Sequence, residues 1–504
     1  MKMVKSLLLG TAAGFVAIAG AQAADLPVKA RPVQYVKICS LYGAGFYYIP
    51  GTDMCLKVGG WARVYDAWGM NGNSTNGALV TGQNSTRATQ NLAPKVRGYI
   101  TLDARNQTEY GTVRSYIAVG YNSGGPQSGV GSGNQTAPGT NTALSPYDNA
   151  VGFNANRAFI QFAGFTFGIT TSFYDFYSQP ATSFFGGSVN PASDTGDPGD
   201  FVFGAYTAML GGGLSATLSA ENPRTTAVIN GGASSMFVFA TGSTTAGNLG
   251  IQPASSAEAN QWPDIVANLR VDQTWGSAQI MGAIHDVAAT YYGSSDTSGS
   301  PSDEIGWAVG AGIKLLAPMI GAGDYLQAQV NYSEGARKYV DFSYNNMYSM
   351  FNGGNYGIGI GSDGVFGATG TSIELTTAWG VNVAYEHFWN PHWQTSIYGA
   401  YTATTYDATA NGDMCHIETI AAFSYTAGAT CNNNFQTVTI GTRTQFNLDS
   451  QTYLGVDIVY QELQSGLAGM QSNYGNGAEA AGPRTVSNQS ALMGEFRVHR
   501  NFYP

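Results

Sequence analysis

The chain is 504 residues long, carries a formal net charge of -10 at pH 7, and has only 11% charged residues. Typical globular domains carry about 25% charged residues, so this chain has too little charge to coat a large water-soluble protein. The acidic balance argues against a nucleic-acid partner, and the lack of a second apolar run of about 18 residues excludes a bundle of transmembrane helices.

The chain begins with the pattern of an export signal. Lys2 and Lys5 precede the apolar residues 7–20, and the tripeptide AQA at 21–23 matches the small-x-small site of signal-peptide cleavage. A retained transmembrane helix would need about 20 apolar residues. We therefore expect residues 1–23 to be a cleaved signal peptide, whose removal changes the net charge to about -12 because it takes away two lysines and no acids.

Residues 95–105, KVRGYITLDAR, show a pattern that recurs along the chain. Polar side chains such as Arg97 and Tyr99 alternate with apolar ones such as Ile100 and Leu102, which is the period of a strand with one polar and one apolar face. Sixteen runs have this pattern and about the length of a tilted strand that crosses a bilayer. They are residues 56–68, 95–106, 112–121, 153–163, 165–174, 201–209, 214–221, 264–274, 278–287, 305–315, 324–335, 372–388, 393–404, 436–446, 451–462 and 489–502.

The connections between these runs alternate between short and long. The short ones, such as NQTEYG, LGGG, WNPH and NLDS, have the Gly, Asn, Asp and Pro residues of tight hairpins. The long ones, such as 122–152, 175–200 and 222–263, are rich in Gly, Ser, Thr and Asn. An even number of strands with short turns at one end and long loops at the other is typical of an outer-membrane barrel, in which the polar face lines the inside.

We therefore predict an all-β fold: a 16-stranded antiparallel transmembrane β-barrel with short periplasmic turns and long extracellular loops. Residues 56–504 form the barrel, and residues 24–55 form a segment on its periplasmic side. Aromatic residues near strand ends suit the two interfacial girdles of such a barrel. The aromatic residues considered are Tyr65, Trp68, Trp307, Phe388 and Trp389.

The four cysteines form two pairs with equal spacing. Cys39 and Cys55 are 16 residues apart, and so are Cys415 and Cys431. An even count in an exported protein favours two local disulfides, Cys39–Cys55 and Cys415–Cys431. A zinc site is the alternative, although neither pair has the CxxC form.

Three segments resemble the porins of alphaproteobacteria, especially the rhizobial and Brucella type. They are ICSLYGAGFYYIPGTDMCLKVGGWARVYDAWG at 38–69, SFYDFYSQP at 172–180 and EFRVHRNF at 495–502. The resemblance covers most of the chain and is most specific in the first segment. It implies a trimeric diffusion channel with sixteen strands, and a small hairpin that turns at Pro50-Gly51 and brings Cys39 close to Cys55.

The resemblance also implies that the third long loop folds into the barrel and narrows the pore, with acidic residues facing arginines on the wall. The candidate loop acids are Asp175, Asp194 and Asp197, and the candidate wall bases, which face the lumen by strand parity, are Arg63, Arg97, Arg114 and Arg157. Opposed rows of charge would create a transverse field that orients dipolar solutes. For Asp200 we expect a solvated loop charge, and a Ca²⁺ site within 194–200 is a minor alternative, because the spacing differs from that of an EF-hand.

The predicted function is passive diffusion of ions and small hydrophilic solutes through an outer-membrane porin. The protein would contact outer-membrane lipid and lipopolysaccharide, form a homotrimer, and need no cofactor and no metal. No GxSxG or HExxH motif indicates an enzyme, and the glycine-rich GIGIGSDG at 357–364 precedes no helix, so we expect it to be flexible loop sequence. The excess of acidic over basic residues weakly favours the passage of cations over that of anions.

Two alternatives remain. The first is a solute-selective channel, for example for sugars, which would need an aromatic ladder along the lumen. The candidate ladder residues are Tyr99, Tyr116, Phe159 and Tyr174. The second is a surface adhesin or phage receptor that acts through loops such as 222–263.

Overall fold

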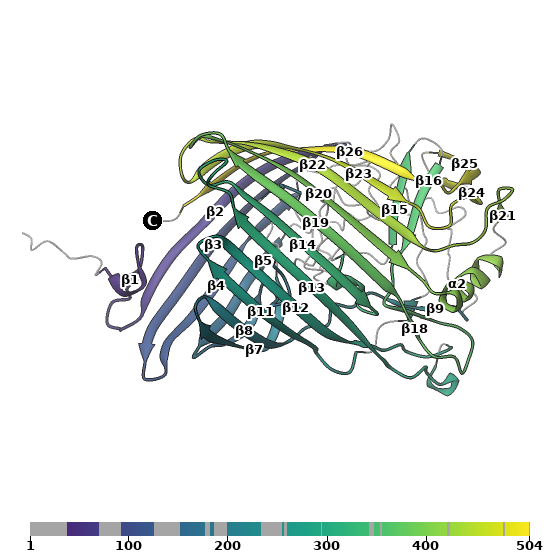
Figure 1. The fold of residues 1–504 in the computed structure, drawn as a ribbon, viewed down its shortest axis with the longest axis horizontal. Helices are drawn as coiled ribbons and strands as arrows, with labels where there is room; N and C mark the ends of the chain where they lie inside the picture. Colours follow the sequence, from purple (N-terminus) through teal and green to yellow (C-terminus); the bar gives the residue numbers. More distant parts are fainter. Residues whose placement is uncertain are drawn as a thin grey trace, which may run out of the picture.

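The computed structural model describes residues 38–69, 92–124, 152–176, 182–185, 199–232, 255–256, 260–293, 295–341, 347–352, 355–420, 424–476 and 479–502. Within these ranges, sixteen antiparallel strands form one closed barrel (Figure 1). The barrel strands are β2 (Cys55–Trp68), β3 (Leu92–Thr108), β4 (Gly111–Gly124), β5 (Gly152–Phe162), β6 (Phe165–Thr170), β7 (Asp200–Gly211), β8 (Leu214–Glu221), β11 (Asp264–Gln273), β12 (Gly276–Val287), β13 (Glu304–Leu316), β14 (Tyr325–Glu334), β19 (Thr377–Phe388), β20 (Trp393–Thr405), β22 (Phe435–Asn447), β23 (Thr452–Gln464) and β26 (Gln489–Asn501).

The sheet closes where the first barrel strand meets the last. β2 pairs with β26 in an antiparallel register that places Arg63 opposite His499 and Trp61 opposite Asn501. On its other side β2 pairs with β3, with Arg63 opposite Arg97. Closure leaves no unpaired sheet edge, which is required of a sheet surrounded by lipid.

All sixteen predicted strands are present as barrel strands; most of their ends differ from the prediction by one to three residues, and two differ by four or more. The strand predicted at 165–174 ends at Thr170, because the chain then turns out of the wall, with the Asp175 amide donating to the Ser172 carbonyl at 3.2 Å. The strand predicted at 372–388 joins the barrel only at Thr377. Both differences fall at the long-loop end, where the alternating pattern continues into loop sequence.

The two faces of the barrel have opposite polarity. Ile100 is 51% exposed on the outer face, whereas its neighbour Thr101 is 5% exposed on the inner face. The same contrast holds at Ile280, 60% exposed, and Gln279, 4% exposed. An apolar outside and a polar inside are the arrangement of a transmembrane barrel with a hydrated lumen.

Exposed tryptophans mark both ends of the apolar band. One group lies at the short-turn end and the other at the long-loop end, as expected for side chains that prefer the membrane interface. The first group is Trp275, Trp389 and Trp393, and the second is Trp68, Trp307 and Trp379. The girdle assignment of Tyr65 was wrong: this side chain is buried in the lumen, because odd-numbered residues of β2 point inward.

Short turns join the strands at one end of the barrel. Between β5 and β6 the two connecting residues, Ala163 at φ 48° and Gly164 at φ 86°, both have positive φ. This is the type I′ geometry that matches the twist of two paired strands. A short segment at the same end pairs β1 (Tyr47–Tyr48) with the start of β2.

Both predicted disulfides are confirmed. The Cα atoms of Cys39 and Cys55 are 6.0 Å apart, and those of Cys415 and Cys431 are 5.9 Å apart. Both distances are in the usual range for bonded cysteines. The first disulfide closes the predicted hairpin, since β1 and β2 pair on either side of Pro50-Gly51. The zinc alternative is therefore wrong.

At the long-loop end, several loops pack together as a cap (Figure 1). A shared apolar core joins residues from the loops after β8, β14, β20 and β23. Its buried residues are Ile229, Ile358, Ile360, Val365, Tyr406, Ala410, Met414, Leu467, Met470 and Val486. The long loops also contain short elements: η4 (Asp296–Ser298), η5 (Arg337–Tyr339), β9 (Val228–Asn230), β10 (Ser255–Ser256), β15 (Met347–Asn352), β16 (Asn355–Ile360), β17 (Gly364–Phe366), β18 (Glu374–Leu375), α2 (Ala408–Ile420), β21 (Ser424–Tyr425), β24 (Met470–Asn476) and β25 (Glu479–Thr485). The N-terminal hairpin, at the opposite end of the barrel, contains η2 (Ser40–Tyr42).

The prediction of flexible loop sequence at 357–364 was wrong. β16 covers the first part of this segment and pairs with β15, because alternate residues Ile358 and Ile360 give it an apolar face that the cap buries. Among the described residues, no helix is both long and apolar enough to span a membrane.

Ile440→Arg should destabilise the barrel, because Ile440 is 58% exposed near the middle of β22. A charge there would face the centre of the bilayer, and we expect the free energy of unfolding to fall by about 2–4 kcal/mol. Leu448→Arg is the matched control, since Leu448 is exposed at a short turn, where the expected loss is about 0–1 kcal/mol. Denaturant unfolding in lipid vesicles measures both, and equal losses would contradict the assigned membrane depth.

Candidate functional site

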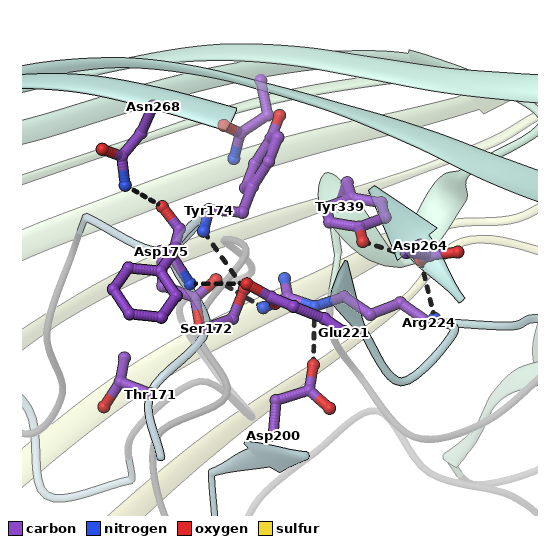
Figure 2. Close-up of polar contacts among 12 residues, drawn as sticks. Thr171, Ser172, Tyr174, Asp175, Asp200, Glu221, Arg224, Asp264, Asn268 and Tyr339 are labelled. Atoms are coloured by element: carbon purple, nitrogen blue, oxygen red, sulfur yellow. Dashed lines mark hydrogen bonds and ion pairs between the residues drawn. The ribbon is translucent and has the colours of Figure 1, made fainter. Parts of the chain in front are cut away.

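The third long loop, residues 171–199, begins along the inner wall of the barrel (Figure 2). The Phe173 amide donates to Glu221 Oε1 at 3.0 Å, and Asn268 Nδ2 donates to the Phe173 carbonyl at 2.5 Å. Gln279 Nε2 donates to the Tyr174 carbonyl at 3.2 Å. The first part of the loop is therefore held by β8, β11 and β12, from inside the barrel.

A later part of the same loop is held by the other side of the barrel. Asp457 on β23 accepts hydrogen bonds from Ser183 Oγ at 2.9 Å and from the Phe184 amide at 2.6 Å. Ser396 of β20 donates to the Thr182 carbonyl, and Arg497 of β26 donates to the Phe184 carbonyl. In the ring of sixteen strands β23 lies seven strands from β11, almost diametrically opposite. The described parts of the third loop thus contact two nearly opposite sides of the inner wall, as expected for a loop that folds into the barrel.

The start of the loop is anchored by a buried cation. Arg224, just after β8, pairs with Asp175 at 2.9 Å and with Asp200 at 3.3 Å, and its guanidinium carbon lies 4.8 Å from the ring centre of Tyr339. Burial by itself lowers the pKa of Arg224, but the carboxylates of Asp175 and Asp200 outweigh it and hold that pKa well above its ordinary value. Arg224 is therefore a permanent positive charge that ties the loop to β7 and β8.

A third acidic residue links this anchor to the loop after β14. Asp264 accepts hydrogen bonds from the Arg224 amide at 3.0 Å, from Tyr339 Oη at 2.7 Å and from His285 Nδ1 at 2.7 Å. Burial, reinforced by the charge of Asp264, raises the pKa of Tyr339 well above its ordinary value, so the phenol stays protonated and donates. Figure 2 shows Asp264, Arg224 and Tyr339 meeting beside the loop root.

The predicted loop acids have different positions. Asp175 lies in the ion pair with Arg224, a residue that the sequence analysis did not nominate. Asp194 and Asp197 lie outside the described residues, as does most of the segment considered for Ca²⁺. The expectation that Asp200 is solvated was wrong, because its side chain is 10% exposed and paired with Arg224.

The four predicted arginines share the inner face of the wall but lie at different heights. Arg63 and Arg97 are direct neighbours across β2 and β3. Arg114 is opposite Arg105, close to the short turn, and pairs with Asp103 at 3.0 Å. Arg97 and Arg105 are eight residues apart on β3, or about 26 Å along a strand. Parity thus places all four on one face, and register separates them into groups.

Arg157 belongs to the root of the third loop. Its guanidinium donates to the Asn156 carbonyl at 2.7 Å and to Thr171 Oγ1 at 3.4 Å. Thr171 is the first residue of the loop after β6. Arg157 therefore lies where the loop leaves the wall.

Sequence reasoning missed two basic residues next to Arg63 and Arg97. In the register across β26, β2 and β3, Arg497 and Lys95 both lie opposite Tyr65, one step from the row that contains Arg63 and Arg97. We call Arg63, Lys95, Arg97 and Arg497 the basic arc. The alternation in EFRVHR was a usable signal for Arg497, whereas its proximity to Arg63 depends on barrel closure.

Comparisons with known proteins identify the family. A family model described as the porin subfamily matches residues 25–488. The chain belongs to the porin family. The porin Omp2b of Brucella canis is 34% identical over 224 residues, which cover 43% of this chain and 54% of that protein, and Omp2b of Brucella suis is 33% identical over 228 residues with the same coverage. The chain thus spans about half the length of the curated relatives it matches.

The fold of this porin is also that of a solved channel. The outer membrane channel DcaP of Acinetobacter baumannii has a TM-score of 0.54 at 14% identity, with 90% of this chain and 99% of that chain covered. At this identity the likeness concerns the fold alone.

Arg224→Met should destabilise the porin strongly, because it leaves the carboxylates of Asp175 and Asp200 buried without their counter-charge. The expected loss in free energy of unfolding is about 3–5 kcal/mol. Arg270→Met is the matched control, since Arg270 forms an exposed pair with Asp272 whose expected contribution is about 0–1 kcal/mol. Unfolding curves for both variants measure the difference, and similar losses would show that Arg224 is no anchor.

Proposed function

We propose that this porin is a water-filled channel of the outer membrane through which ions and small hydrophilic solutes diffuse passively. The observation that carries the proposal is the polar lumen inside an apolar outer face. The third loop is bound to the wall of this lumen at β8 and β11 on one side and at β23 on the other. A loop fixed to both walls narrows the lumen, and its Tyr174 and Phe185 pack against buried side chains of the inner wall. The chain would reach this membrane through cleavage of the signal peptide at residues 1–23.

We further propose that charge at the narrowed section sets the passage of solutes. The loop side comprises Asp175, Asp194 and Asp197, with the first of these held by Arg224. The wall side comprises Arg63, Arg97, Arg114 and Arg157. Arg63 and Arg97 would act at the height of the basic arc, Arg157 at the loop root, and Arg114 nearer the short turns. Opposed charges across a hydrated constriction orient dipolar solutes and separate the paths of cations and anions.

The assembly proposed is a homotrimer embedded in lipid and lipopolysaccharide. Support for the lipid contact comes from the outward apolar band and its tryptophans. The trimer follows from the resemblance of the sequence to the alphaproteobacterial porins. The packed cap favours a second candidate function, a receptor surface for an adhesion partner or phage, since its shared apolar core gives the loops a fixed shape.

Purified protein in a planar bilayer should give stepwise conductance increments, grouped in threes, that stay open at low voltage. The polar lumen provides the path for ions. A folded barrel that inserts into the bilayer without conducting ions would contradict the proposed channel function. The receptor function of the cap would then be the remaining proposal.

Asp457→Ala should enlarge the single-channel conductance. The substitution removes the acceptor of Ser183, Phe184 and Tyr398, so the far end of the third loop loses its hold on β23. Buried donors left without a partner cost about 1–3 kcal/mol each, which is enough to favour release of the loop. Asp449→Ala, at an exposed short turn, is the matched control and should leave conductance unchanged. An unaltered conductance in Asp457→Ala would show that the loop is not the constriction.

A further inference from the structure

A row of stacked rings crosses four neighbouring elements of the lumen wall and ends on the third loop. From β3 to the loop, the rings are those of Tyr99, Trp61, His499, Tyr453 and Phe184. Successive ring centres are 4.7, 5.6, 4.8 and 6.0 Å apart, and successive planes differ by 20°, 34°, 20° and 18°. We call these five residues the ring row. It spans the seam at which β2 meets β26.

Guanidinium groups lie beside both ends of the ring row. The Arg63 guanidinium carbon is 4.6 Å from the ring centre of Trp61, and that of Arg97 is 5.6 Å from Trp61 and 5.5 Å from Tyr99. At the other end, the guanidinium carbon of Arg497 is 4.4 Å from the ring centre of Phe184. The row is thus accompanied by three arginines of the inner wall.

Neighbouring rings decide which part of each ring a solute can reach. Trp61 lies between Tyr99 and His499, and Tyr453 lies between His499 and Phe184, so the faces of these rings are occupied. Trp61 and Tyr453 nevertheless remain partly exposed, and so do Arg63 and Arg97. A solute in the lumen therefore meets ring edges and guanidinium groups.

Both kinds of group favour the same class of solute. The edge of an aromatic ring is the positive end of its quadrupole, and it attracts the negative face of another ring in an edge-to-face contact. Guanidinium groups bind carboxylates through two parallel hydrogen bonds. Sugars, in contrast, pack on the faces of aromatic side chains, and those faces are covered here.

We propose that the ring row, with Arg63 and Arg97, forms a binding site inside the channel for small aromatic carboxylates. The carboxylate contacts the two guanidinium groups, and the aromatic ring lies against the edges of Trp61 and Tyr453. The proposal rests on the proposed function as a diffusion channel, and it names a class of solute that the channel retains briefly. Such a site must be weak to allow release as well as entry.

The test uses the wild-type protein in a planar bilayer, with chloride as the background anion and three probes added at equal concentration. Benzoate has both a ring and a charge, acetate has the charge alone, and benzyl alcohol has the ring alone. Benzoate should produce concentration-dependent interruptions of the current at least tenfold more often than either control probe. Equal effects of benzoate and acetate would overturn the site while the open channel stands.

Two further outcomes separate the site from the function on which it rests. A barrel that conducts no chloride would remove the proposed function itself. A conducting channel that maltose interrupts as strongly as benzoate does would overturn the anion site in favour of a sugar site.

Trp61→Ala tests the residues assigned. This variant should weaken the benzoate effect about tenfold, and Arg63→Gln with Arg97→Gln should weaken it further, because they remove the carboxylate partners. Tyr116→Ala is the matched control: Tyr116 stacks on Phe159 at 5.2 Å and lies 5.1 Å from the Arg114 guanidinium carbon, outside the ring row. It should leave the benzoate effect unchanged. Equal losses in Trp61→Ala and Tyr116→Ala would overturn the assignment, and the wild-type probes decide the proposal if either variant fails to fold.

Discussion

Closure of the sheet between β2 and β26 is the constraint on which the rest of the molecule depends. In lipid, an unpaired strand edge leaves backbone groups without hydrogen-bond partners at a cost of several kcal/mol each. The pairing of Arg63 with His499, and of the residues around them, satisfies this requirement with strands from the two ends of the chain. It also places the two most informative sequence segments side by side on the lumen wall. The basic arc and the ring row both cross this seam.

The crossing of the third loop needs strong anchors because a loop in a hydrated lumen can exchange its hydrogen bonds for water. At its root, Arg224 is buried; its amide donates to Asp264, and its guanidinium pairs with Asp175 and Asp200. At the far wall, the single carboxylate of Asp457 accepts from the loop backbone and from two hydroxyl groups. A charged acceptor makes stronger hydrogen bonds than a neutral one. Two anchors on nearly opposite walls fix the path of the loop more firmly than any one contact could.

The sequence alone was sufficient to predict the strands, their inward and outward faces and the two disulfides, because each of these depends on the local spacing of residues. Alternation at Ile100 and Thr101 identifies the outward and inward faces directly. The height of a residue in the barrel depends on the register between strands, so parity could not separate Arg114 from Arg63. The partner of Asp175 was also beyond the sequence, since Arg224 lies 49 residues away in another loop. The cap was missed for a related reason: its core combines a few apolar residues from each of four loops.

The net charge of the chain is a poor guide to the ions that such a lumen prefers. Acidic residues outnumber basic ones by 32 to 22, yet several of the inner acids are matched by a neighbouring arginine, as Glu386 is by Arg443 and Glu495 by Arg497. Charges in the outer loops are screened beyond about 8–10 Å at physiological salt. The basic arc, in contrast, gathers four basic side chains on three adjacent strands at the height where the third loop meets β26, and Arg497 among them pairs with the acid Glu495. An ion passing this section experiences the local arc rather than the sum over the chain, so an acidic protein can present an anion-attracting passage.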